Sequence, residues 1–463
     1  MDSPRGKNSA TQAVAEIRAI LGERITTAQS VRDQHGKDQT WNPGAPPDAV
    51  AFVQRAEEVQ TIVRVCGRFG VPVIAYGAGT SLEGHFSAPF GGISVDLSAM
   101  NRILEVNAAD LDCRVEAGVT RKQLNAHLRD QGLFFPVDPG ADASLGGMAA
   151  TRASGTNAVR YGTMRENVLN VTAVMADGSI VRTGSRAKKS SAGYDLTRLL
   201  VGSEGTLGII TEVALKLYGI PEAIVAAVCP FPSVEACCNA TIAAIQMGLP
   251  VARIELVDTE HVKAFNTYSK LDLAVTPTLF LEFHGTAASA KEQAETFAAI
   301  ATDHGGGPYR MSQREEERQK LWQARHDAFW ATKSLMPGKE SFATDVCVPI
   351  SRLAECVTET QTDLAVNGLY GPIVGHVGDG NFHVVLYCDR NDANEVSRVK
   401  AVYSRLIERA IAMGGTSTGE HGIGAGKMAY LDREHGPALA FMRDIKRALD
   451  PRNILNPGKN AAI

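Results

Sequence analysis

Three separate segments in the first half of this 463-residue chain are poor in bulky side chains. They cover residues 77–92 (GAGTSLEGHFSAPFGG), 139–155 (PGADASLGGMAATRASG) and 201–208 (VGSEGTLG). Glycine and other small residues allow a backbone to turn sharply and to approach a ligand closely. One such segment would suit a single phosphate contact. Three of them in one stretch of chain predict an extended ligand that is wrapped by backbone.

The first of these segments directly follows a short apolar run, VPVIAYG, which predicts a buried strand. Gly77, Gly79, Thr80 and Ser81 then form a turn whose N–H and hydroxyl groups suit an anion, usually a phosphate. The turn is not a GxGxxG motif that opens a helix, so a nicotinamide-binding Rossmann unit is disfavoured. For this peptide alone, a tight surface turn remains the alternative.

The pattern of apolar residues predicts an α+β protein of several parts. Ala13, Ile17, Ile20 and Leu21 recur at helical spacing in an N-terminal helical lead, residues 1–42. Residues 57–70 (EEVQTIVRVCGRFG) predict an amphipathic helix that ends at Gly70, and short Val/Ile-rich strands and glycine-rich turns fill much of residues 43–217. Strands and long Ala/Glu/Lys-rich helices, one of them over residues 313–333, alternate in residues 218–413, which predicts a second, ferredoxin-like α+β domain. The final segment, residues 414–463, is expected to return to the first domain.

Composition excludes several classes of protein. The 47 basic and 51 acidic residues give a net charge of −4, which does not favour nucleic acid as a partner. The 8 cysteines contain no CxxC pair, which argues against a disulfide framework and fits a reducing compartment. No apolar run approaches the ~20 residues that span a bilayer, and the polar opening lacks a secretory signal. We expect a cytoplasmic protein that is at most peripheral to a membrane.

The three glycine-rich segments, in this order, resemble the FAD-binding domain of the vanillyl-alcohol oxidase family of flavoproteins, and the resemblance implies a domain of two subdomains. The resemblance implies that residues 77–81 hold the FAD pyrophosphate, that residues 154–161 lie near the isoalloxazine, and that Gly205 and Ile209 lie near the adenine. Some members attach the flavin through a histidine in the first loop. This chain has Thr and Ser there and His85 only further on, which implies non-covalent FAD. The implied cofactor-binding residues are Tyr76, Gly77, Ala78, Gly79, Thr80, Ser81, Pro139, Gly140, Ser144, Gly147, Ala149, Ser154, Gly155, Asn157, Tyr161, Glu204, Gly205, Ile209 and Asn456.

A second group of residues in the other half of the chain has the composition of a metal site. In IVGHVGDGNFHVVLY, His376 and His383 flank a Gly-Asp-Gly turn between two apolar runs. On one straight strand their rings would face opposite ways, whereas across a turn they can converge. Glu420 and His421 lie in a later glycine-rich loop, GTSTGEHGIGAGK. Two histidines and a glutamate suit Zn²⁺ or Mn²⁺, but buried hydrogen-bonded histidines are the alternative for either segment alone.

The peptides HVGDGNFH, GEHGIG and LDPRNILNPGK together resemble the flavin enzymes that oxidise D-2-hydroxy acids. The resemblance implies that His376, His383 and Glu420 bind a divalent metal and that His421 is the general base. It places Asn381 at a substrate-contacting position and Arg325 at the carboxylate-binding position. A solvated charge on a helix is the alternative for Arg325.

Phe329 and Ala343 stand near positions where the D-2-hydroxyglutarate branch has polar residues. A second carboxylate would be left unpaired beside them, so we expect D-lactate or related aliphatic D-2-hydroxy acids as substrates. Glycolate and D-2-hydroxyglutarate remain alternatives. A non-redox synthase of the alkyl-glycerone-phosphate type and a metallohydrolase are the alternatives from other classes. With no haem or iron–sulfur motif, the electron acceptor is expected to be external, namely cytochrome c, a quinone or an electron-transfer flavoprotein.

Overall fold

The computed structural model describes residues 7–38 and 40–463, so part of the predicted N-terminal lead, residues 1–6, lies outside the described residues. The chain forms two compact units. The first comprises residues 1–154, Gly162–Ile220 and Glu420–Ile463, and the second comprises Gly155–Tyr161 and Pro221–Gly419. The short segment 155–161 therefore belongs to the second unit, although it lies within the sequence of the first.

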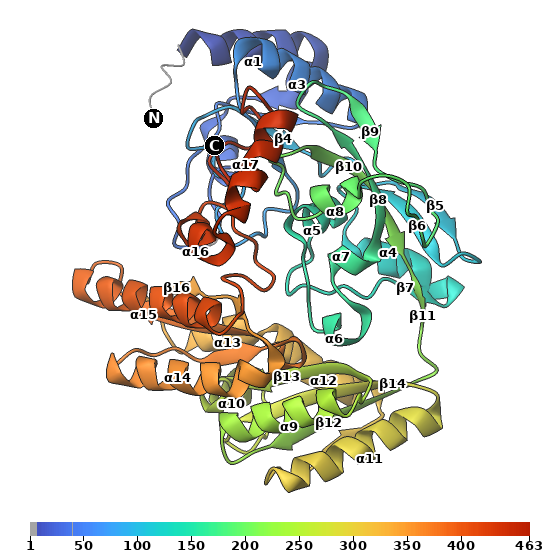
Figure 1. Ribbon diagram of the computed structural model, residues 1–463, viewed down its shortest axis with the longest axis vertical. Helices are drawn as coiled ribbons and strands as arrows, with labels where there is room; N and C mark the ends of the chain where they lie inside the picture. The colour runs from blue at the N-terminus through green and yellow to red at the C-terminus, as the bar shows by residue number, and fades with distance from the viewer. Residues whose placement is uncertain (1–6, 39) are drawn as a thin grey trace. The chain divides into compact units, whose positions relative to one another are not determined.

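The first sheet of the first unit carries the earliest glycine-rich loop. Its strand order is β1 (Ile25–Thr26), β2 (Ala49–Phe52), β4 (Ile93–Asp96) and β3 (Val73–Tyr76), and β3 and β2 both run parallel to β4. Helices α1 (Lys7–Leu21) and α3 (Ala56–Phe69) pack together beside it (Figure 1). Ala13, Ile17 and Leu21 are buried in its core, whereas Ile20, predicted on the same face, is 52% exposed. Gly70 ends α3 in the left-handed conformation, as its position predicted.

The second sheet of the first unit is antiparallel and has a separate core. Its order is β5 (Ile103–Asn107), β6 (Asp112–Glu116), β10 (Ile209–Lys216), β8 (Val168–Val174) and β9 (Ile180–Arg182). Apolar residues from β6, β8 and β10 pack against α4 (Arg121–Leu128), α5 (Leu145–Thr151) and α8 (Leu196–Leu200). Two sheets with two cores confirm the two-subdomain architecture expected for the cofactor domain.

One larger sheet forms the centre of the second unit. Its order is β15 (Arg310–Ser312), β12 (Ala223–Pro230), β14 (Thr278–Gly285), β13 (Val251–Val257), β18 (Ile373–Gly375), β19 (Asn381–Cys388) and β16 (Glu340–Ala343), and β17 (Val346–Cys347) also pairs with β19. All of these pairings are antiparallel. Together with its helices, this sheet confirms the α+β class of the second half.

The two faces of this sheet are covered by different helices. Helices α10 (Thr259–Tyr268), α12 (Glu315–His326) and α13 (Ala328–Ser334) contribute to one apolar core with Phe280 of β14. Phe283, which points to the opposite face, packs against Phe297 of α11 (Ala287–Asp303). The sequence suggested one continuous helix through residues 313–333, but the chain breaks at Asp327. The break places Arg325 in the last turn of α12.

The remaining elements connect these layers and complete the C-terminal segment. After α15 (Ala393–Ala412), the chain re-enters the first unit, where α17 (Ala438–Leu449) precedes a parallel bridge between Leu455 and Val73 of β3. Within residues 7–38 and 40–463, no helix combines the length and the apolar character needed to cross a bilayer. The other short elements are α2 (Gln29–Gln34), β7 (Leu133–Phe134), α6 (Ala158–Tyr161), α7 (Met164–Asn167), β11 (Tyr218–Gly219), α9 (Val234–Gln246), α14 (Leu353–Val366) and α16 (Leu431–His435).

Candidate active site

The three glycine-rich segments come together at the end of strand β3 in the first unit. A Cβ atom added to Gly77 would lie 2.4 Å from the Ser144 hydroxyl, so the first and second segments approach each other closely there. The second and third segments are joined by backbone hydrogen bonds from the N–H groups of Gly202 and Glu204 to carbonyls of α5, each 2.9 Å. Gly205, with φ +72°, lies against Ala75 of β3. Segments distant in sequence thus line one region of the unit.

Glu204 fastens the third segment to the loop that carries His421. Its two carboxylate oxygens accept hydrogen bonds from the N–H groups of Ile423 (2.7 Å) and Gly424 (2.8 Å), and Nε2 of His85 lies 3.5 Å from Oε1. Burial alone would raise the pKa of the Glu204 carboxyl, but His85 and the two N–H donors outweigh burial, and the pKa lies below its usual value. Glu204 is therefore an ionised anchor for the GEHGIG loop.

Glu83 holds the same loop from its other side. Its backbone carbonyl accepts hydrogen bonds from Ala425 (2.8 Å) and Gly426 (3.1 Å). Its carboxylate lies 3.3 Å from Nζ of the fully buried Lys427 and 3.8 Å from Nδ1 of His421. The backbone carbonyl of Glu83 and the carboxylate of Glu204, both in the first unit, therefore fix the backbone next to the predicted base.

The other predicted cofactor residues of the first unit are either buried or at least partly solvent-accessible. Tyr76 is buried against His35, with ring centroids 4.1 Å apart, and Ile209 lies in an apolar core. Asn456 donates hydrogen bonds to the backbone carbonyls of His85 and Glu204, which brings the C-terminal segment to the same region. Ala149 and Ser144 are buried as well. The residues that are at least partly solvent-accessible are Ala78, Gly79, Thr80, Ser81, Pro139, Gly140, Gly147 and Ser154.

The predicted flavin-side segment 155–161 is held by polar side chains of the second unit. Oδ1 of Asn157 accepts a hydrogen bond of 2.9 Å from Arg253, and the Tyr161 hydroxyl lies 2.8 Å from Nδ1 of His284. Nε2 of His284 is 2.7 Å from Glu282, a carboxylate 3.6 Å from Arg253. Burial would raise the pKa of Glu282, but Arg253 and His284 lower it below its usual value. A closed network thus links α6 to strands β13 and β14.

His376 and His383 lie on the two sides of a short turn in the second unit. Gly380, at φ +79°, reverses the chain, and the two imidazole rings stand 5.5 Å apart between centroids at an interplanar angle of 84°. Nδ1 of His376 lies 2.8 Å from Oε1 of Glu255, and Nδ1 of His383 lies 3.0 Å from the carbonyl of Thr344. A ring whose Nδ1–H donates in this way presents Nε2 as the ligand atom.

Glu420 completes a group with the composition of a metal site. One donor atom from each of His376, His383 and Glu420 lies within 4.8 Å of the others. Glu420 directly follows Gly419, whose loop is anchored in the second unit by the bond from the Thr418 hydroxyl to Asp345, 2.7 Å. Two imidazoles and one carboxylate with open positions fit Zn²⁺ or Mn²⁺ by the chemistry of the donor set.

Arg325 and Asn381 flank the two histidines in the second unit. Arg325 is only 8% exposed, which excludes the solvated-charge alternative, and it pairs with Glu255 at 2.5 Å. Its Nε–H has no hydrogen-bond partner among the described residues, which leaves a buried donor for a ligand. Asn381 uses its amide N–H groups on Asp345 and on the carbonyl of Val346, both 2.7 Å. A substrate contact of Asn381 would therefore involve its amide oxygen.

Comparison with known proteins decides the family. A model described as "FAD linked oxidases, C-terminal domain" matches residues 220–460, and one described as "FAD binding domain" matches residues 47–184. The chain belongs to the FAD-linked oxidases. The expected flavoprotein family is thereby confirmed.

Two relatives of this FAD-linked oxidase are similar over nearly its whole length. A probable mitochondrial D-lactate dehydrogenase from Danio rerio is 52% identical over 97% of this chain and 91% of its own. A mitochondrial D-lactate dehydrogenase [cytochrome] from Arabidopsis thaliana is 43% identical over 97% of this chain and 80% of its own. A structure of p-cresol methylhydroxylase with substrate bound shares the fold, with a TM-score of 0.82, 19% identity and coverage of 99% and 98%.

The first unit of this FAD-linked oxidase has features that suit the cofactor. A Cβ at Gly77 would require the Ser144 hydroxyl to move, and a Cβ at Gly79 would lie 2.2 Å from the Tyr76 hydroxyl, so the glycines present bare backbone beside these two hydroxyls. Gly79 has φ +68°, which favours glycine. A glycine-lined cradle without bulky side chains fits an extended dinucleotide.

Sequence reasoning missed the carboxylates that support the predicted residues. Glu255 lies within the apolar strand peptide RIELVD, and Asp345 lies within TDVCV. Both are almost completely buried. A lone acidic residue inside an apolar strand is a usable signal, because an ionised carboxylate is rarely buried without a partner. The sequence did not reveal which partner, since Arg325 and His376 are distant in the chain.

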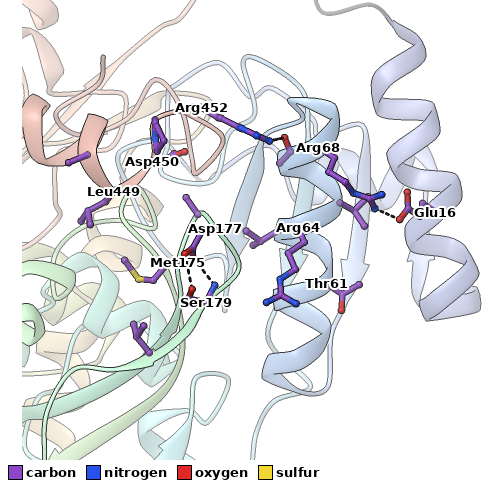
Figure 2. A pocket seen from close by; sticks show the side chains of 17 residues that line it. Glu16, Thr61, Arg64, Arg68, Met175, Asp177, Ser179, Leu449, Asp450 and Arg452 are labelled. Atoms are coloured by element: carbon purple, nitrogen blue, oxygen red, sulfur yellow. Dashed lines mark hydrogen bonds and ion pairs between the residues drawn. The ribbon is translucent and has the colours of Figure 1, made fainter.

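A separate hollow of about 1080 Å³ lies in the first unit of this oxidase, between α3, β8, β9 and the end of α17. Figure 2 shows its charged side chains, among them Arg68 paired with Glu16 and Asp177 bonded to Ser179. Its lining residues include none of the predicted cofactor, metal or catalytic residues among those the structure describes. This hollow is therefore not the candidate active site.

Gly380→Ala tests whether the turn positions the histidines of this FAD-linked oxidase. An added Cβ would lie 2.1 Å from the carbonyl oxygen of Val348, in a conformation with φ +79°. We expect a loss of ~1–3 kcal/mol of stability and weaker metal binding, measured by thermal unfolding and metal titration. Gly368→Ala is the matched control, because Gly368 has φ +60° but nothing closer than 3.8 Å. Equal metal binding by both variants would contradict the positioning role of the turn.

Proposed function

We propose that this chain is an FAD-dependent dehydrogenase that oxidises D-lactate and related aliphatic D-2-hydroxy acids to 2-oxo acids. The single observation that carries the proposal is the group formed by His376, His383 and Glu420, with His421 next in the chain. The two relatives named as D-lactate dehydrogenases support the choice of substrate. The fold alone would not support this choice of substrate, because one fold can host several different reactions.

Oxidising a 2-hydroxy acid removes a hydride from Cα and a proton from its hydroxyl. Bound FAD supplies the hydride acceptor, flavin N5. His376, His383 and Glu420 would hold a divalent metal, which would lower the pKa of the substrate hydroxyl. His421 takes the hydroxyl proton as general base. Because Glu83 and Glu204 fasten its loop, the imidazole is held in place before substrate arrives.

Arg325 binds the substrate carboxylate in this proposal. A guanidinium suits a carboxylate because its N–H groups form a planar fork. Among residues 7–38 and 40–463, the buried Nε–H of Arg325 has no hydrogen-bond partner, so a substrate oxygen can accept from it. The predicted contact of Asn381 adds a polar group on the same side of the unit, at the start of β19.

Phe329 and Ala343 favour a short apolar substrate side chain. Phe329 is partly exposed on α13 and stacks edge-on against Trp330, with ring centroids 5.1 Å apart. Neither residue can pair with a second carboxylate. Glycolate has no side chain for these two residues to accept or reject, so it remains the second candidate. D-2-hydroxyglutarate is disfavoured because its second carboxylate would have no partner.

The electron acceptor is proposed to be a cytochrome, because a relative is named for a cytochrome; cytochrome c is the candidate expected from the sequence. A quinone and an electron-transfer flavoprotein are the other candidates from the sequence. The cytoplasmic location stays a prediction that rests on the eight cysteines, all of them unlinked thiols. The two relatives are named as mitochondrial enzymes.

An anaerobic reduction screen tests the proposed function. The purified protein is mixed with D-lactate, L-lactate, glycolate and D-2-hydroxyglutarate in turn, and the flavin absorbance is followed. We expect fastest bleaching with D-lactate and little with L-lactate, because hydride transfer requires one face of Cα toward the ring. Colourless protein would exclude a flavoenzyme. Yellow protein that none of the four acids bleaches would favour a non-redox synthase.

A further inference from the structure

Glu255 lies at the centre of the candidate site in the second unit, although it belongs to no predicted group. It is on strand β13, its side chain is 1% exposed, and its two oxygens face different partners. Oε1 lies 2.8 Å from Nδ1 of His376, and Oε2 lies 2.5 Å from the guanidinium of Arg325. We propose that Glu255 is a positioning residue that joins the metal ligand His376 to the substrate-binding Arg325.

The cost of burying this carboxylate indicates why two partners are needed. An ionised carboxylate removed from water is strongly destabilising unless it is paired and hydrogen-bonded. Glu255 meets both conditions only because α12 ends next to β13 and the turn after β18 brings His376 to the same face of the sheet. Three elements from separate parts of the sequence therefore meet at one side chain.

The contact with Glu255 sets the ligand atom of His376. When Nδ1–H of a histidine donates to a carboxylate, Nε2 carries the lone pair, and the charge makes the ring a stronger ligand. His383 differs in this respect, since its Nδ1 lies 3.0 Å from the neutral carbonyl of Thr344 and 3.7 Å from the carboxylate of Asp345. The two histidines are therefore unequal, because only His376 has a carboxylate within hydrogen-bond distance of its Nδ1.

The contact with Glu255 also sets the direction of Arg325. One terminal nitrogen of the guanidinium forms an ion pair with Oε2 at 2.5 Å, while the buried Nε–H has no hydrogen-bond partner among the described residues. A planar guanidinium fixed at one edge presents its other donors in a defined plane. Glu255 thus places a metal ligand and a carboxylate-binding donor at a fixed separation, which suits the adjacent carboxylate and hydroxyl of a 2-hydroxy acid.

The inference rests on the proposed function, and Zn²⁺ affinity tests it separately from activity. Yellow, FAD-loaded protein is stripped of metal with a chelator and titrated with Zn²⁺ in a calorimeter. Glu255→Gln keeps the size of the side chain but removes its charge. We expect Zn²⁺ to bind about 10- to 100-fold more weakly, with an unchanged ratio of FAD to protein. The KM for D-lactate is expected to rise as well, because Arg325 loses its support.

Glu282→Gln is the matched control. Glu282 is a buried carboxylate on the neighbouring strand and on the same face of the sheet, and it also pairs with a histidine and an arginine, His284 and Arg253. It contacts neither His376 nor Arg325 in any described interaction. A loss of Zn²⁺ affinity in the Glu255 variant alone supports the inference, whereas equal losses in both variants would assign the effect to general disturbance of the sheet and overturn it.

The remaining outcomes separate this inference from the proposed function. If Glu255→Gln binds Zn²⁺ as tightly as the wild type does, the inference is overturned. The proposal that the protein oxidises D-lactate is not affected by that result. Absence of Zn²⁺ binding by the wild type also overturns it, even if D-lactate bleaches the flavin. If D-lactate fails to bleach the wild type, the proposed function fails, and the Zn²⁺ comparison still decides on Glu255. Should the Gln variant not yield yellow protein, Glu255→Asp replaces it, because a carboxylate one methylene shorter cannot span both partners.

Discussion

His421→Ala is expected to abolish the reduction of the flavin by D-lactate while FAD stays bound. Removal of a positioned general base typically costs 10²–10⁴-fold in rate, and the rate of anaerobic bleaching measures it directly. FAD retention is expected because His421 is not a predicted cofactor residue and its imidazole takes no part in the bonds that Glu204 and Asn456 make. The loop itself should persist, since its backbone bonds to Glu83 and Glu204 do not involve the imidazole.

His435→Ala is the control for this prediction. His435 is also a histidine of the C-terminal segment, at the end of α16, and its side chain is about one-third exposed. Its replacement should leave the bleaching rate within a factor of two. A His421→Ala protein that is yellow and bleaches at the wild-type rate would remove the assignment of the base and would direct attention to another proton acceptor.

The local elements of this fold were predictable because they depend on short-range patterns. The helix that ends at Gly70, the strand of residues 73–76 and the turn at Gly380 follow from spacing, glycine conformation and apolar runs. The α+β class followed from the alternation of such elements. The break at Asp327 was missed, because no glycine or proline marks it and the apolar pattern continues through it.

The support of the site was not predictable from the sequence. Glu255 meets His376 across 121 residues, and Glu204 meets Ile423 across 219. Such pairs depend on strand order and on loop conformation, which local patterns do not contain. Segment 155–161 gives a third example. Its sequence places it between cofactor-binding peptides, but Arg253 and His284 draw it to the second unit. Motifs thus predicted the reacting groups, and only the structure identified the residues that contact them.

Removal of the proposed metal is the second change with a large expected effect. Protein dialysed against a chelator should retain its yellow colour but lose at least about 100-fold in the rate of bleaching by D-lactate, because a Lewis acid at a developing charge contributes several kcal/mol. Zn²⁺ or Mn²⁺ added back should restore the rate, since two imidazoles and a carboxylate suit both ions. Metal analysis before and after dialysis establishes the stoichiometry, which we expect to fall from about one ion per chain.

His383→Ala separates a metal effect from an effect of the chelator. His383 contacts the carbonyl of Thr344 and faces His376, and its loss removes one of three donors. The variant is expected to bleach as slowly as the stripped wild type and to gain little from added Zn²⁺, because two remaining donors bind a divalent ion weakly. Wild-type protein that is verified to be metal-free and still bleaches at full speed would show that His421 and Arg325 act without an ion. The histidine pair would then have to be explained as a buried structural element of the turn around Gly380.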